Sequence, residues 1–179
     1  MITDTSPLMS VYEGWDGHQR SLIRTIAPLS PQQLAYRPAP HLRSVGEIAS
    51  HLSLGRVGWF QRMQAPGSKE VVRQVNGWED EHRIVENAAE LVRRLEVTWQ
   101  MIETTLNSWT ISDLAQTYQH TYWGKTYAIS RQWTIWRIMS HDLHHGGELV
   151  ILLGIQGINA PELGDLGGHI TEPPLAEPS

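Results

Sequence analysis

The chain has no cysteine among its 179 residues, and this absence excludes disulfides, thiolate metal ligands and a thiol nucleophile of its own. Any thiol chemistry would need a thiol supplied from outside the chain. A cysteine-free sequence fits a reducing compartment. The N-terminus also lacks a basic segment followed by an apolar one, so we expect no signal peptide and a cytoplasmic protein.

Long apolar runs and basic clusters are missing as well. No apolar stretch approaches the ~20 residues that a membrane-spanning helix needs. The formal net charge is -5, and the densest basic run is the pair Arg93 and Arg94, too little to neutralise the phosphates of a nucleic acid. We therefore expect neither a nucleic acid nor a membrane as a partner.

The composition that remains is that of a folded domain. Hydrophobic residues make up 40% and charged residues 18% of the chain. At this length we expect a single domain over residues 1–179, with an irregular Gly- and Pro-rich tail over about 156–179. Eight Trp and five Tyr against one Phe favour aromatic side chains with a polar end, which suit a border between core and water or a cleft.

Apolar residues spaced three and four apart predict an all-α fold, a bundle of four long helices. The expected helices span about 8–29, 44–65, 79–109 and 132–153, with capping boxes at Ser30 and Ser44 marking a short extra helix and the second long one. Residues 67–77 resemble a polar linker, and the long linkers allow a crossover topology. Residues 116–132, rich in Thr and Tyr, suggest a small hairpin.

Three histidines lie within five positions of the last expected helix, in the segment SHDLHHGGEL. His141 and His145 are one turn apart, the spacing at which a helix offers two imidazoles to one metal ion. His144 is an alternative partner for His141, at a spacing of three. Apolar residues at four and seven positions from His145 place it toward the interior. The residues at the same spacings from His144 are polar, which places His144 on the flank of the bundle. The sequence therefore favours His141 and His145 as ligands.

A third ligand should come from another helix, and His51, flanked by apolar residues, is the candidate. Three imidazoles leave a position open for water or substrate, as catalytic metal sites do. The alternatives are exposed helix histidines without a metal and, for His51, a hydrogen-bonded core residue. His169 in the tail is a less favoured fourth ligand.

Several neighbours have two interpretations. Glu148, seven residues after His141, is a candidate catalytic base. Asp142 could hydrogen-bond a ligand imidazole, but a place in solvent is favoured because it points about 100° away from His141. Trp133 and Trp136 could wall a pocket, with packing in the core as the favoured interpretation.

The segment HDLHHGGELVILLGIQGINAPELGD, residues 141–165, resembles the last-helix signature of the DinB/YfiT superfamily of metal-binding helical bundles. SVGEIASHLSLGRVGWF, residues 44–60, resembles the second helix of that family. The resemblance implies a four-helix bundle with a long crossover connection, often a homodimer. It also implies a divalent metal, commonly zinc or nickel, held by His51, His141 and His145.

Members of that superfamily with known activity are mostly transferases that use small thiols such as mycothiol or bacillithiol, together with a thiol-dependent maleylpyruvate isomerase. The resemblance thus implies transfer of a low-molecular-weight thiol to a small electrophilic substrate. Residues 146–148 are Gly-Gly-Glu where the family has Arg-Gly-Gln, so its contacts to anionic substrates are not carried over. A hydrolase using metal-bound hydroxide, and a non-enzymatic metal- or ligand-binding bundle, are the alternatives.

Overall fold

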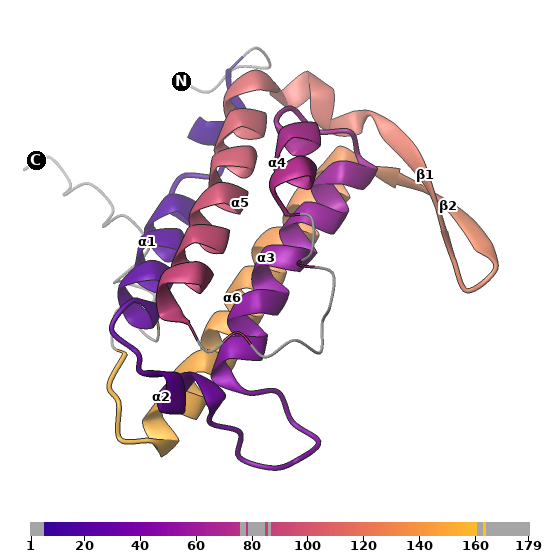
Figure 1. The fold of residues 1–179 in the computed structure, drawn as a ribbon. Coiled ribbons are helices and arrows are strands. Elements are labelled where there is room, and N and C mark those ends of the chain that lie inside the picture. Colours follow the sequence, from indigo (N-terminus) through magenta and orange to yellow (C-terminus); the bar gives the residue numbers. More distant parts are fainter. Residues whose placement is uncertain (1–5, 76–77, 79–84, 86, 161–162, 164–179) are drawn as a thin grey trace, which may run out of the picture.

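The computed structural model of the protein describes residues 6–75, 78, 85, 87–160 and 163. These residues are mostly helical, with one small sheet (Figure 1). The helices are η1 (Leu8–Ser10), α1 (Trp15–Ile26), α2 (Pro31–Ala35), α3 (Val45–Arg62), α4 (Ser68–Gln74), α5 (Ala88–Ser108), η2 (Ile111–Ala115) and α6 (Arg131–Ile155). The strands are β1 (Thr117–Tyr122) and β2 (Lys125–Ser130).

The four longest helices of the described chain pack around a common core. Helix α3 lies against both α5 and α6, and α1 lies against the same two helices (Figure 1). The core consists of two apolar clusters: Leu22, Leu52, Leu91 and Leu149 belong to one, and Phe60, Met101, Ile102 and Ile138 belong to the other. In the described part of the chain, no helix is long and apolar enough to cross a membrane.

A layer of buried polar side chains separates the two clusters along the helices. On each helix, the polar residue lies between positions that belong to one cluster and positions that belong to the other. The layer contains Gln19 of α1, Arg56 of α3, Thr98 of α5 and Asp142 of α6, all of them 2% exposed or less. Polar groups buried this deeply must satisfy one another, and they do so directly beside the histidine cluster.

The capping boxes place His51 as the sequence predicts. The Ser44 hydroxyl accepts a hydrogen bond from the Glu47 amide, and the Glu47 carboxylate accepts one from the Ser44 amide. A second capping box joins Ser30 and Gln33 at the start of α2. The start of α3 is therefore fixed by side-chain chemistry, about two turns before the histidine.

The predicted hairpin is confirmed and stands away from the helices at the start of α6 (Figure 1). Its antiparallel register pairs Thr117 with Ser130 and Tyr122 with Lys125. The two-residue turn between the strands has positive φ at both Trp123 (47°) and Gly124 (73°). Left-handed values at both central positions define the tight turn whose twist matches the strands.

Two helix starts and one expected linker differ from the prediction. The first long helix begins at Trp15, not near residue 8, because Gly14 has φ 98° and breaks the pattern. The expected linker at 67–77 contains α4, which buries Val71. Helix α5 begins at Ala88, capped by the Asn87 side chain. Residues 79–84 and 86 of the predicted third helix, and 161–162 and 164–179 of the predicted tail, lie outside the described residues.

Candidate metal centre

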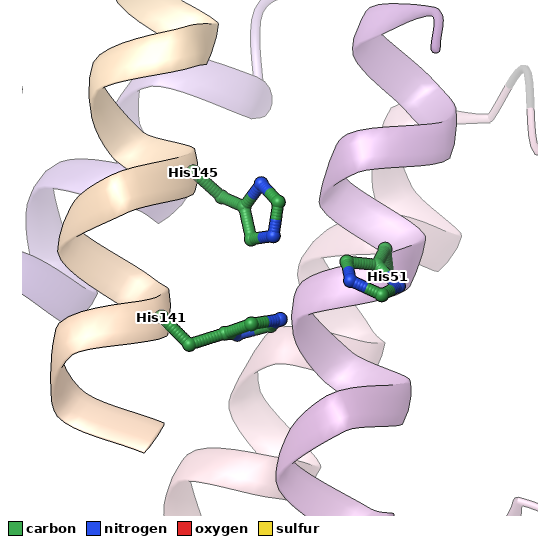
Figure 2. A group of neighbouring side chains, drawn as sticks. All are labelled: His51, His141 and His145. Carbon is green, nitrogen blue, oxygen red and sulfur yellow. The ribbon is translucent and has the colours of Figure 1, made fainter. Parts of the chain in front are cut away.

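Three imidazoles from two helices converge between α3 and α6 (Figure 2). His51 of α3 and His141 and His145 of α6 each offer a ring nitrogen, and these nitrogens lie within 4.8 Å of one another. Their ring centroids are 4.4–5.0 Å apart. Figure 2 shows the two α6 rings projecting toward the His51 ring. The sequence-predicted set of ligands is thus brought to one place.

Burial keeps two of these rings neutral at physiological pH. Desolvation, helped by the positive charge of Arg43, lowers the pKa of His51 to about 4. Desolvation also lowers the pKa of His145, although a hydrogen bond to Glu148 opposes it. A metal binds the neutral imidazole, so burial holds His51 and His145 in the form that a ligand requires.

Glu148 orients the His145 ring. The Nδ1 atom of His145 donates to Glu148 Oε2 at 2.7 Å, since a carboxylate can only accept. This bond leaves Nε2 as the nitrogen available to a metal. His144 also approaches Glu148, with Nε2 at 3.2 Å from Oε1, but its side chain is 67% exposed. His145 is buried and His144 lies on the surface, as the helix phase predicts.

The position of the His141 ring depends on the absence of a side chain at Gly55 in the facing helix α3. A Cβ added at Gly55 of α3 would lie 2.8 Å from His141 Cε1, so any larger residue there would displace the ring. The buried Nδ1 of His141 has no hydrogen-bond partner among the described residues. Asp142 Oδ1 lies 3.8 Å from it, beyond hydrogen-bond distance. The ring is therefore held by packing and keeps its hydrogen-bonding capacity.

A buried ion pair lies directly beneath the histidines. Arg56 Nη2 donates to Asp142 Oδ2 at 2.8 Å, and both side chains are 0% exposed. Trp15 Nε1 donates to the same carboxylate, and Gln19 Oε1 accepts from Arg56. Burial alone would raise the pKa of the Asp142 carboxyl, but the Arg56 guanidinium holds it below its usual value. The favoured prediction that Asp142 faces solvent is wrong.

The sequence contained the signal that Asp142 is buried. Three core residues share the helix face of Asp142: Ile135 lies seven positions before it, Ile138 four positions before it and Leu149 seven positions after it. The same phase rule that places His145 inward places Asp142 inward as well. Trp133 and Trp136, expected in the core, are 41% and 59% exposed, so that prediction is wrong too. His169 lies outside the described residues.

Comparison with known families assigns the fold. The model of the DinB superfamily matches residues 15–149 of the chain, which include all three histidines of the triad. The chain belongs to the DinB superfamily. A crystal structure of a DinB-like protein from Bacillus cereus ATCC 10987 is similar, with a TM-score of 0.60 and 14% sequence identity over 82% of this chain and 91% of that one. A comparison with curated proteins found no match.

The side chains present fit the divalent metal with which DinB proteins are associated. Zinc and nickel both accept imidazole nitrogen, and zinc–nitrogen bonds of about 2.0–2.1 Å require ligand atoms a few ångströms apart. The triad meets that requirement, since its three ring nitrogens lie within 4.8 Å of one another. The donor set contains no hard oxygen ligand, so it favours such metals over magnesium or calcium.

We expect Glu148→Ala to weaken zinc binding by about 10- to 100-fold, since the variant frees the His145 ring from the carboxylate that fixes its orientation. Glu148→Gln, which can still accept a hydrogen bond, should fall between the alanine variant and the wild type. Competition titration with a chromophoric chelator measures both. His144→Ala is the matched control, and a control as damaging as Glu148→Ala would refute the orienting role.

Proposed function

We propose that this DinB-superfamily protein is a divalent-metal-dependent enzyme, with zinc or nickel bound by His51, His141 and His145, and that it transfers a low-molecular-weight thiol to a small electrophilic substrate. The observation that supports the proposal is the convergence of three imidazole nitrogens from two helices within 4.8 Å. Three ligands leave a coordination position for a cosubstrate.

Several residues of the chain have distinct roles in the proposed reaction. When bound at the triad, a divalent ion is a Lewis acid that lowers the pKa of a thiol or of water. Glu148 holds the His145 tautomer, and Gly55 leaves room for the His141 ring. The buried pair of Arg56 and Asp142 fixes α3 against α6, and so fixes the distance between the two halves of the triad. The chain has no cysteine, so the thiol is a substrate from solution.

The contacts of Glu148 favour thiol transfer over hydrolysis. Attack by metal-bound water is helped by a carboxylate or imidazole that is free to move protons between water and the leaving group. Glu148, which the sequence suggests as that base, is instead engaged by His145 and His144. We therefore assign Glu148 a positioning role. A thiol needs less help, because its pKa in water is already near 8.5.

Turnover of a fluorogenic electrophile tests the proposal. In the reaction of monochlorobimane with bacillithiol or mycothiol, a carbon–sulfur bond forms, the carbon–chlorine bond breaks, chloride leaves and the thiol proton passes to solvent. We expect zinc- or nickel-loaded protein to accelerate this reaction and to leave p-nitrophenyl acetate unchanged. Ester turnover without thiol transfer would support the hydrolase, and turnover of neither would support a binding protein.

The proposal includes the arrangement of the helices that is typical of the family. We take α1, α3, α5 and α6 as the four-helix bundle of DinB proteins, with its long crossover connection between α3 and α5. An experimental structure that gave α3 and α5 opposite directions would contradict this topology.

A homodimer is also part of the proposal. The outer face of α6 carries a row of exposed apolar side chains: Trp136 (59%), Leu143 (40%), Ile151 (65%) and Ile155 (58%). Rows of this kind mark contact surfaces. Sedimentation should give twice the 20.3 kDa mass of the chain, and Ile151→Asp should reduce it to the monomer. Sedimentation of wild-type protein as a monomer at micromolar concentration would contradict the dimer.

A further inference from the structure

A cavity of about 760 Å³ lies between the end of α3, the start of α6 and the hairpin. Its walls come from four elements: Trp59 and Arg62 at the end of α3, Trp133 and Arg137 at the start of α6, His120 and Tyr122 on β1, and residues 127–130 on β2. The volume lies in the range of small-molecule sites. Arg137 is one turn, about 6 Å, before His141 on α6, so the cavity and the triad are successive along that helix and share no residue.

The cavity is lined by a continuous row of aromatic rings. Ring centroids lie 5.4 Å apart from Trp133 to Trp59 and from Trp59 to His120, then 6.4 Å apart from His120 to Tyr122. Trp123 at the hairpin tip extends the row, stacked on Tyr122 at 4.8 Å. Much of this row is open to solvent, with Trp133 41% and Tyr122 54% exposed. An exposed aromatic row is a surface on which a flat ring can stack.

The same cavity carries two positive charges that no carboxylate of the described residues neutralises. Arg62 and Arg137 both lie over the Trp59 ring, each 5.0 Å from its centroid. Neither forms an ion pair with any residue that the structure describes. Other arginines do pair with carboxylates, namely Arg20, Arg37, Arg56, Arg73, Arg93, Arg94 and Arg131. In a chain of net charge -5, two such guanidiniums at one pocket favour an anionic ligand.

We propose that this cavity, the aryl-anion pocket, binds a small planar aromatic anion. The ring of the ligand stacks on the exposed part of the aromatic row, at Trp133 and Tyr122, and its carboxylate or other anionic group lies between Arg62 and Arg137. Binding itself needs no metal, because no triad residue lines the cavity. A further consequence rests on the proposed function. If the protein is the proposed transferase, its electrophilic acceptor is an aromatic anion that the pocket holds on the side of α6 toward His141.

Isothermal titration with 2-naphthoate tests the pocket, with uncharged 2-naphthalenemethanol as the matched probe. We expect saturable one-to-one binding of 2-naphthoate, at least tenfold tighter than that of the alcohol. Binding should be equal in protein as purified and after EDTA treatment. Absence of 2-naphthoate binding at millimolar concentration, or equal affinity for the two probes, would overturn the proposal.

Two variants test the charges separately from the fold. Arg62→Gln/Arg137→Gln should reduce the preference for 2-naphthoate at least tenfold and leave the affinity for the alcohol nearly unchanged. Arg20→Gln/Arg73→Gln alters the net charge equally at paired, exposed positions and should keep the preference. A control that loses the preference as fully as the pocket variant would refute the pocket.

Trp133→Ala should weaken both probes, since stacking serves each of them. Unchanged affinity for both would place the ligand elsewhere and overturn the proposal. The proposed function fails independently of the pocket: protein that binds 2-naphthoate but transfers no thiol keeps the pocket and loses the enzyme. Protein that transfers a thiol but does not bind 2-naphthoate would keep the proposed enzyme and overturn the pocket.

Discussion

Replacing Asp142 with alanine should lower the free energy of unfolding by about 3–5 kcal/mol, because the variant leaves a buried guanidinium without its carboxylate. Asp142 and Arg56 are both 0% exposed and 2.8 Å apart. The carboxylate also accepts from Trp15, so the substitution breaks another buried hydrogen bond besides those of Arg56. Urea or guanidinium unfolding, monitored by tryptophan fluorescence and circular dichroism, measures the loss.

Two further variants separate the ion pair from the general effect of a substitution. Arg56→Met/Asp142→Leu removes both charges and should lose much less stability than the sum of the two single variants. Glu70→Ala breaks the exposed pair with Arg73 and should cost about 1 kcal/mol or less. A loss for Asp142→Ala no larger than that of Glu70→Ala would show that the pair does not hold α3 against α6.

Alanine at His51, His141 or His145 should each remove the metal. We expect protein purified without an affinity tag to carry about one equivalent of zinc or nickel, and each variant to retain less than a tenth of it. Loss of a ligand should weaken metal binding by more than the 10- to 100-fold that is typical when a residue that only orients a ligand is removed. Inductively coupled plasma mass spectrometry measures the content, and thermal melts check that the variants fold.

His120→Ala and His144→Ala are the matched controls for the triad. Both residues lie outside the triad, His120 on the hairpin against Trp59 and His144 at the surface. These variants should keep the full metal content. A His51 variant with unchanged metal content would instead indicate a site built on α6 alone, such as the grouping of His144, His145 and Glu148.

The triad could be predicted from the sequence because its information is local. Spacing along α6 put His141 and His145 on one face, and apolar residues at four and seven positions chose His145 over His144. The Ser44 capping box fixed where α3 begins and therefore where His51 lies. Resemblance to a family supplied the pairing of the two helices, which neither pattern contains by itself.

The supporting network and the pocket were harder to predict because they depend on tertiary contacts. Arg56 stands among apolar neighbours in α3, but only the packed helices show that Asp142 is its partner. Helix phase is consistent with the burial of Asp142, but the prediction followed its 100° offset from His141 and wrongly favoured solvent. Trp133 meets Trp59 across two helices beside the hairpin, an arrangement that no spacing in the sequence reveals.

The central claim is that imidazoles from two helices meet at one ion. A crystal structure of zinc-loaded protein, with an anomalous difference map recorded above and below the zinc edge, tests it most directly. The account predicts one strong peak between α3 and α6, about 2.0–2.1 Å from a ring nitrogen of each of His51, His141 and His145. A zinc-loaded crystal with no peak there, or with a peak bound by α6 residues alone, would contradict it.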